Sequence, residues 1–281
     1  MLHILNHTRS VANCRNQGQF CSRVNQYINW QSIASKLAYF NTITRLSGKA
    51  YSSVVATSTN DGDLFSQIMK DDKLQVIENG VNVEKYANQA APQLQPMLIY
   101  FGRWSANKGL VESLDLFAAL SARDPNWKLI IAGREYDHSV SDLQTRINER
   151  GLQDRVHLVA NPSDEEIRNL LKQASYYLCL SRHEGFGIAP IEGMSAGLTP
   201  ILSNIPPFRR LIDQSGLGFT LDENSSVDAT VDRLLKLHSE GNEAYLERRE
   251  QAIKFSNQYA WPQVADRYLA LYEQLGGGHV R

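Results

Sequence analysis

The stretch YYLCLSRHEGFGIAPIEGMSAGLTPIL, residues 176–202, carries the main signal for the fold class. It opens with a short apolar run at 176–180 and closes with another at 199–202. Continuous apolar runs of this length are typical of parallel strands that are covered on both faces. After the first run come Gly185 and Gly187 and then Pro190, which suits the first turn of a helix. The stretch therefore predicts a strand, a loop, a helix and a second strand.

The same alternation extends over most of the chain. Apolar runs at 97–101, 127–132 and 156–159 predict three more strands. Between the runs, apolar residues recur at helical spacing, and 163–166 has the pattern of a capping box. These apolar positions are Leu110, Leu114, Phe117 and Leu120; Leu143, Ile147 and Leu152; and Ile167, Leu170, Leu171 and Ala174. Strands that alternate with helices predict an α/β fold with a doubly wound parallel sheet, which binds ligands in the loops after its strands.

A shorter piece of the same kind lies upstream. Residues 53–57 and 74–77 are interpreted as strands, and 61–69 as the helix between them. Asp61-Gly62-Asp63 has the spacing of a metal-binding Asp-x-Asp motif, but we interpret it as the start and cap of this helix. At the other end, 245–275 is helical in pattern.

The bulk composition narrows the classes of function. A formal net charge of -1 gives no general attraction to nucleic acid or to an anionic membrane. No apolar run approaches the roughly 20 residues of a membrane-spanning helix, and the first residues turn polar too early for a signal peptide. Cys14, Cys21 and Cys179 lack metal-type spacing, so we expect thiols in a reducing compartment. These features predict a cytoplasmic protein that does not bind nucleic acid.

The first candidate motif spans 102–109, between a predicted strand and the next helix. Arg103 and Lys108 place two cations where that helix begins, and the helix amino terminus adds free N–H groups and positive dipole character. A diphosphate would be well held by such a loop. The alternative interpretation is a pair of solvated surface cations.

The second candidate motif follows the strand at 176–180. Glu184 is expected in the loop and Glu192 within the next helix, so each carboxylate can accept hydrogen bonds from sugar hydroxyls at one end of a nucleotide-sugar. The alternatives are a surface carboxylate for Glu184 and a solvated helix face for Glu192. A glycosidase-like carboxylate pair is a further alternative, but it would not explain the phosphate-type loop upstream.

The third motif, a strand and turn at 76–82, by itself indicates only a turn. In this order and spacing, however, the three motifs resemble those of the family-4-type retaining glycosyltransferases, or glycosyl transferases group 1. FGRWSANKGL (101–110) is similar to the family's G-R-x4-K-G segment, and HEGFGIAPIEGMSAGLTPI (183–201) to its E-x7-E segment. VIENGVNVEKY (76–86) resembles a third family segment. The resemblance implies a GT-B fold of two Rossmann-like domains.

The resemblance also implies a role for each matched residue. Arg103 and Lys108 match the pair that contacts the donor diphosphate, in the donor-binding segment that begins at Gly102. Glu184 matches the carboxylate that holds the hydroxyls of the transferred sugar, and Glu192 the one that binds the nucleotide ribose. The loop whose N–H groups contact sugar and phosphate corresponds to Gly185, Phe186, Gly187 and Ile188. Arg103, Lys108 and Glu184 are thus the expected catalytic residues, and the family scheme requires no metal or other cofactor.

Within the family, several segments resemble most closely the α-mannosyltransferases of xanthan- and acetan-type exopolysaccharide assembly. Those enzymes move mannose from GDP-mannose to a polyprenyl-diphosphate-linked cellobiose. The resemblance implies the same donor and acceptor here, with peripheral contact at the inner face of the membrane. Arg209 and Arg210 then either touch anionic lipid or an acceptor diphosphate, or form a solvated helix face.

The chain departs from the family in its amino-terminal part, where we identify neither the family's Gly-rich loop nor its histidine. We therefore expect an incomplete amino-terminal Rossmann-like domain, the remnant of the acceptor domain, at 1–86, with no fold assigned to 1–35. A linker follows at 87–96, the donor-binding domain at 97–260 and a carboxyl-terminal helix and tail at 261–281. This pattern is interpreted as an amino-terminal truncation. The alternatives to an active transferase are a module that binds a nucleotide-sugar without transferring it and, third, a nucleotide-sugar epimerase of the same fold.

Overall fold

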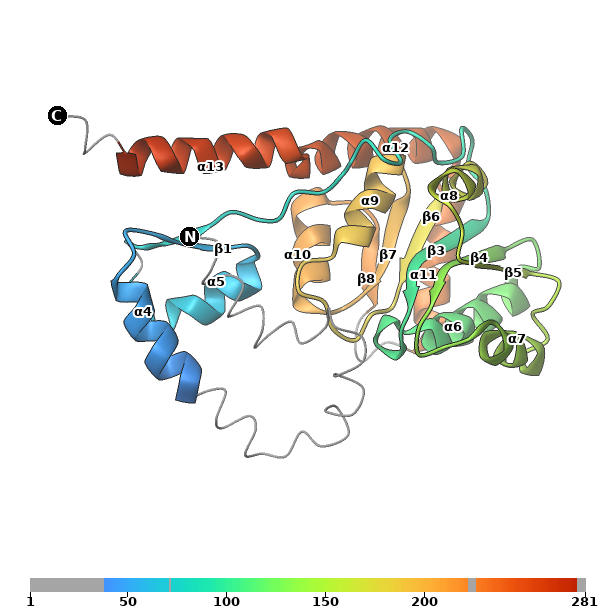
Figure 1. Ribbon diagram of the computed structural model, residues 1–281. Helices are drawn as coiled ribbons and strands as arrows, with labels where there is room; N and C mark the ends of the chain where they lie inside the picture. The colour runs from blue at the N-terminus through green and yellow to red at the C-terminus, as the bar shows by residue number, and fades with distance from the viewer. Residues whose placement is uncertain (1–37, 71, 222–225, 277–281) are drawn as a thin grey trace. The chain divides into compact units, whose positions relative to one another are not determined.

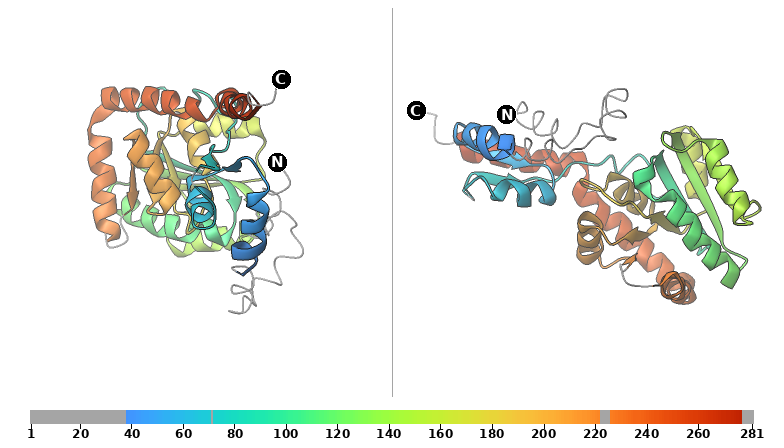
Figure 2. Two further views of the ribbon diagram at one scale, coloured as in Figure 1. Left: turned by 90° about the vertical axis from the view of Figure 1, so that its left-hand side faces the viewer. Right: turned by 90° about the horizontal axis from the view of Figure 1, so that it is seen from below.

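The computed structural model describes residues 38–70, 72–221 and 226–276. The described chain divides into two compact units, which are described separately (Figures 1 and 2). Of the described residues, those up to Asn79 and from Arg267 onward form unit 1, and those within Gly80–Asp266 form unit 2. The polar segment 1–35 and the thiols Cys14 and Cys21 lie outside the described residues.

Unit 2 is built on a six-stranded, entirely parallel sheet in the order β5-β4-β3-β6-β7-β8 (Figure 1). Its strands are β3 Met97–Trp104, β4 Lys128–Glu135, β5 Val156–Ala160, β6 Tyr176–Cys179, β7 Thr199–Ser203 and β8 Phe219–Leu221. All four residues of β6 are buried, as expected for a strand that is covered on both faces. The predicted doubly wound parallel sheet is confirmed.

Helices cover both faces of this sheet (Figure 2). They are α6 Leu110–Arg123, α7 Val140–Glu149, α8 Asp164–Leu171, α9 Ile188–Ala196, α10 Pro206–Ser215, α11 Val227–Ser239 and α12 Gly241–Ser256, with the 3-10 turns η3 Ala106–Lys108 and η4 Asn257–Tyr259. The apolar stripes predicted for α6, α7 and α8 are buried. The capping box of α8 is also confirmed, because Ser163 and Glu166 each accept a hydrogen bond from the other's backbone N–H.

Unit 1 contains a two-stranded parallel sheet of β1 Val54–Ala56 and β2 Leu74–Val76. Its helices are η2 Phe40–Thr44, α4 Arg45–Lys49 and α5 Thr59–Ser66. A small apolar cluster of Phe40, Ala56, Phe65 and Ile68 holds these elements together. Helix α13, Trp261–Gly276, begins in unit 2 and continues into unit 1.

Three sequence-based details are corrected by the structure. The cap of α5 is Ser58, whose hydroxyl accepts from the Asp61 N–H, so Asp61 lies in the first turn and is not the cap. Strand β3 continues past residue 101 to Trp104, because its register with β4 extends to the Trp104–Glu135 pair. Strand β8 was missed because three residues are too short to show a period.

The predicted helix at 245–275 is interrupted. Helix α12 ends at Ser256, a 3-10 turn follows, and α13 begins only at Trp261. Ala260 between them has an extended backbone and forms a bridge with Val81. Pro262 explains the restart, because proline lacks the N–H that a helix interior needs and is tolerated in the first turn.

Residues 87–96 belong to unit 2 and form hydrogen bonds with its other elements. The N–H groups of Asn88 and Ala90 donate to the carbonyls of Ser195 and Ala196 at the end of α9. The Tyr245 hydroxyl donates to the Ala91 carbonyl at 2.6 Å. The assignment of this segment as a linker between two domains stays a prediction.

In the part of the chain that the structure describes, we find no helix with the length and apolar character needed to cross a membrane.

The close approach of β3 and β4 predicts that a larger residue at Gly133 destabilises the fold. A Cβ at Gly133 would lie 1.7 Å from the Gly102 carbonyl oxygen, so alanine requires the two strands to separate. We expect Gly133→Ala to lower the free energy of unfolding by about 3 kcal/mol, at the upper end of the range for overpacked cores. Gly185→Ala is the matched control, because a Cβ there meets nothing within 4 Å. Urea unfolding of both variants measures the difference, and equal midpoints would contradict the packing argument.

Candidate functional site

The candidate site lies where the order of the strands reverses. The chain passes from β3 outward to β4 and β5, then returns to place β6 on the other side of β3. In doubly wound sheets such a switch point opens a crevice outside the carboxyl ends of the two central strands, and ligands bind there. The loops after β3 and β6 carry the two strongest sequence motifs.

These two loops are joined by a direct ion pair. The Lys108 ammonium lies 2.5 Å from Oε1 of Glu184, and both side chains are largely buried, at 23% and 15% exposure. Two hydrogen bonds reinforce the pair: the side-chain amide of Asn107 donates to the His183 carbonyl at 2.7 Å, and the backbone N–H of Arg182 donates to the Asn107 carbonyl at 2.9 Å. The structure therefore brings together two predicted site residues that are far apart in the sequence.

Gly109 makes this approach possible. Its φ of 65° is left-handed, and a Cβ there would lie 2.0 Å from the Leu180 carbonyl oxygen at the end of the second loop's strand. Only glycine fits a backbone that is both left-handed and this close to another. The Lys-Gly pair at 108–109 thus combines a cation with the residue that lets it reach the neighbouring loop.

The Glu184 carboxylate is oriented by a second donor. The Ser181 hydroxyl donates to Oε1 of Glu184 at 2.7 Å and lies 3.2 Å from the Cys179 sulfur. The Cys179 thiol is free and fully buried, and burial raises its pKa. The hydrogen bonds from Lys108 and Ser181 both end at Oε1 of Glu184.

Arg103 lies at the carboxyl end of β3 and has an exposed side chain. Its guanidinium lies 5.0 Å from the ring centroid of Tyr136, in the loop after β4. Its carbonyl accepts a hydrogen bond of 2.7 Å from the Tyr100 hydroxyl. Arg103 is therefore on the same edge of the sheet as the Lys108–Glu184 pair, but its guanidinium contacts the Tyr136 ring and not that pair.

Helix α9 starts at this edge. Gly187, with a left-handed φ of 98°, is its amino-terminal flanking residue, and Ile188 at the first helical position is 48% exposed. The first N–H groups of the helix have no intrahelical acceptor, so they can donate to an anion. Phe186 packs edge-on against Tyr259 at a centroid distance of 5.7 Å, which holds the loop before the helix, while Gly185 is exposed.

Glu192 lies on α9, beyond the loop, and is partly buried. Burial raises its pKa, and the nearby charge of Lys85 partly offsets this effect. Lys85 pairs with Asp164 at 2.9 Å, and the Tyr86 hydroxyl donates to the same carboxylate oxygen at 3.1 Å. Burial alone would lower the pKa of Lys85, but Asp164, Tyr86 and Glu192 together outweigh it and raise the lysine pKa.

Sequence reasoning missed the supporting residues of both carboxylates. Ser181 and Asn107 lie inside the quoted motifs, yet their spacing alone does not reveal that one orients Glu184 and the other joins the loops. Lys85 and Tyr86 end the segment VIENGVNVEKY (76–86). Their contact with Asp164 arises only in the folded chain. The resemblance of this segment to the family was the one feature of the sequence that pointed to Lys85 and Tyr86.

The arrangement is suited to a ligand that is anionic at one part and rich in hydroxyl groups at another. A cation and a helix amino terminus stabilise phosphate oxygens, while the two carboxylates accept from hydroxyls. The described residues contain no group of three or more His, Cys, Asp or Glu side chains that could hold a metal ion. The individual roles of the site residues stay a prediction.

Comparison with known proteins agrees with this geometry. The model of the family "Glycosyl transferases group 1" matches residues 82–258. The chain is 49% identical over 242 residues to the GDP-mannose:cellobiosyl-diphosphopolyprenol alpha-mannosyltransferase of Xanthomonas oryzae pv. oryzae, covering 86% of this chain and 63% of that protein. It is 36% identical to the protein of the same description from Komagataeibacter xylinus, over 86% and 61% of the two chains. The chain thus spans less than two thirds of the length of these relatives.

Solved structures agree on the fold. The crystal structure of a glycosyltransferase from Rickettsia africae superposes with a TM-score of 0.69 at 23% identity, covering 84% of this chain and 66% of that one. This likeness supports the predicted GT-B type of architecture. With a family match over 82–258 and these motifs at the switch point, the chain belongs to the glycosyl transferases group 1 family.

Proposed function

We propose that this chain carries the donor-binding half of a retaining α-mannosyltransferase. It binds GDP-mannose and takes part in moving mannose onto a polyprenyl-diphosphate-linked oligosaccharide in exopolysaccharide biosynthesis. The choice of mannose, GDP and the lipid-linked acceptor rests on the two relatives described above. We further propose that it acts in the cytoplasm, with peripheral contact at the inner face of the membrane where such an acceptor would lie.

The observation that carries the proposal is the Lys108–Glu184 pair at the switch point. In this proposal Lys108 contacts the donor phosphates, and Glu184 beside it holds the sugar hydroxyls. A nucleotide-sugar has phosphate and sugar directly bonded, so its binding site needs a cation and a carboxylate side by side. The α9 amino terminus adds N–H donors, and Glu192 farther along α9 is the proposed ribose acceptor.

The proposed chemistry is a substitution at the anomeric carbon on one face of the sugar. The bond from that carbon to the phosphate oxygen breaks, a bond to the acceptor hydroxyl oxygen forms, and a donor phosphate oxygen takes the acceptor proton. Lys108 and Arg103 stabilise the negative charge that develops on GDP, which is an electrostatic and positioning role. Glu184 keeps the sugar oriented through its hydroxyls while the two bonds exchange.

A nucleotide-sugar-binding module without transfer is the second candidate. The family match begins at residue 82 and covers mainly unit 2, so it supports donor binding more directly than acceptor binding. Incubation of the purified chain with GDP-mannose and a polyprenyl-diphosphate-linked cellobiose distinguishes the two. Formation of a mannosylated lipid supports the transferase, whereas binding of GDP-mannose without product supports the module.

Donor binding itself is tested by thermal shift with a panel of nucleotide-sugars. We expect GDP-mannose to give the largest increase in Tm, because a ligand that binds the folded state stabilises it according to its occupancy. Glu192→Ala should weaken GDP and GDP-mannose by about 10- to 100-fold, since it removes a hydrogen bond to a charged acceptor. Glu184→Gln should weaken GDP-mannose relative to GDP, because the sugar that this residue is proposed to hold is present only in GDP-mannose.

Glu247→Gln is the control for these two variants, since Glu247 is exposed on α12. It should bind both ligands as the unmodified chain does. If Glu184→Gln weakened GDP as much as GDP-mannose, the assignment of Glu184 to the sugar would be wrong.

The raised pKa of Glu192 predicts opposite effects on stability and on binding. An acid whose pKa is raised by folding contributes stability below its ordinary value of 4.5, and this contribution is lost as the pH rises through the raised pKa. Glu192→Gln removes the buried charge, so it should raise the Tm of the free chain near pH 7.5 but have little effect near pH 4. Donor affinity of the unmodified chain should fall as the pH is lowered through the raised pKa, because the carboxylate accepts from the ribose. A Tm that is lowered equally by Glu192→Gln at both pH values would show a purely structural role.

A further inference from the structure

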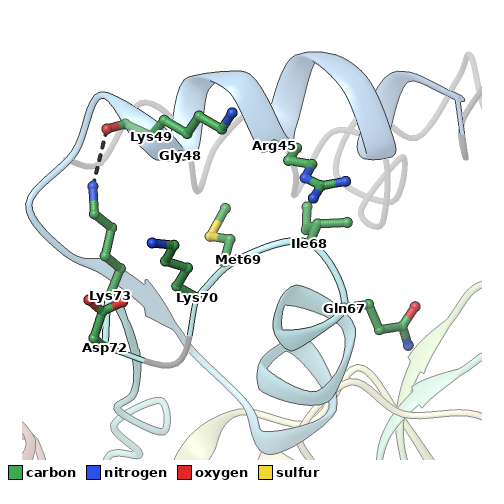
Figure 3. Close-up of a pocket in the computed structure, with 9 residues that line it drawn as sticks. All are labelled: Arg45, Gly48, Lys49, Gln67, Ile68, Met69, Lys70, Asp72 and Lys73. Carbon is green, nitrogen blue, oxygen red and sulfur yellow. Dashed lines mark hydrogen bonds between the residues drawn. The ribbon is translucent and has the colours of Figure 1, made fainter.

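Unit 1 contains a cavity of about 570 Å³ that the donor motifs do not explain (Figure 3). Its lining residues lie on α4 and in the segment between α5 and β2, on either side of residue 71. These segments lead into the strands of the small sheet, whereas the loops that bind ligands in doubly wound folds follow the strands. The cavity therefore belongs to a different part of the fold from the proposed donor site.

The lining is strongly cationic. Arg45, Lys49, Lys70 and Lys73 border the cavity, and Asp72 is the carboxylate among its lining residues. Within the described part of the chain, none of these four cations forms an ion pair with a carboxylate. Four cations around one carboxylate repel one another, and an anion placed between them reduces that repulsion.

Lys73 is fixed in place by the backbone. Its ammonium donates to the carbonyl of Lys49, the last residue of α4, at 3.1 Å (Figure 3). It also donates to the carbonyl of Tyr51 at 2.9 Å. Carbonyls at the end of a helix carry partial negative charge, which would repel an anion. The Lys73 ammonium offsets that charge, so the side chains of Lys49 and Lys70 remain available to a ligand.

The cavity has an apolar base beneath these cations. The Met69 methyl group packs against Gly48, since a Cβ on Gly48 would lie 2.7 Å from the methyl carbon. On the same helical segment, Ile43 and Leu46 are 47% and 61% exposed. A cationic rim beside exposed apolar side chains is compatible with the headgroup of an anionic lipid as well as with a free phosphate compound.

We propose that this cavity binds a phosphate-bearing anion through Arg45, Lys49 and Lys70, with Lys73 holding the surrounding backbone. The ligand is either a free phosphate compound or the headgroup of an anionic phospholipid. Charge-assisted hydrogen bonds from the lysine and arginine side chains to phosphate oxygens supply the recognition.

Met69 provides a local probe for the test, because the chain has only four methionines. The full chain is labelled with [¹³C-methyl]methionine and titrated with inorganic pyrophosphate at constant ionic strength, with the Met69 resonance assigned from Met69→Leu. A saturable shift of that resonance is expected. Lys49→Gln/Lys70→Gln should weaken the response at least tenfold, whereas Lys236→Gln/Lys254→Gln, which removes two exposed lysines of unit 2, should leave it unchanged.

Two further arms separate the ligand sources and the donor site. Glu192→Ala should keep the Met69 response even though it loses GDP-mannose, so failure of the donor proposal does not affect this one. In co-sedimentation, loss of binding to phosphatidylglycerol vesicles in Lys49→Gln/Lys70→Gln identifies a lipid headgroup. Unchanged sedimentation together with a lost pyrophosphate response identifies a free phosphate compound. The proposal is overturned if the substituted chain retains the full Met69 response, or if neither probe depends on these lysines.

Discussion

The pairing of β3 with β6 is the constraint on which the candidate site depends. The two strands are parallel, so their carboxyl ends reach the same edge of the sheet and the loops that follow them meet. Gly109 then allows the first loop to pass against the Leu180 carbonyl, which brings Lys108 to Glu184. A different strand order would leave the same residues in the sequence but separate the cation from the carboxylate.

The two carboxylates of the site are held in different electrostatic environments. Glu184 has a cation and a hydroxyl as direct partners, so its charge is compensated in the free protein. Glu192 is partly buried, and burial raises its pKa against only a partial offset from Lys85. A buried carboxylate gains most from a new hydrogen-bond donor, because the donor replaces solvation that folding removed. Under the proposed function, ribose hydroxyls would supply that donor.

The two units also differ in how far carboxylates compensate the charge of their cations. In unit 2, Lys85 and Lys108 are each matched with a carboxylate. In the described part of unit 1, the cations around the cavity face one another with a single lining carboxylate. Unit 1 also has a small apolar cluster of four buried residues, whereas the sheet of unit 2 is enclosed in an extensive core. The extensive apolar core and the lysines paired with carboxylates are therefore both features of unit 2.

The sequence by itself determined the α/β class, five of the six strands of the main sheet, the capping box of α8, and the residue types of the candidate site. Periodicity and turn residues are local signals, so they can be read without the fold. The tertiary structure alone decided that Lys108 contacts Glu184, that Ser181 orients that carboxylate, and that Lys85 and Asp164 lie near Glu192. These contacts join residues that are distant in the chain, or they depend on the conformation of a loop. The order in which the strands pair brings the distant residues together, and no local sequence pattern encodes that order.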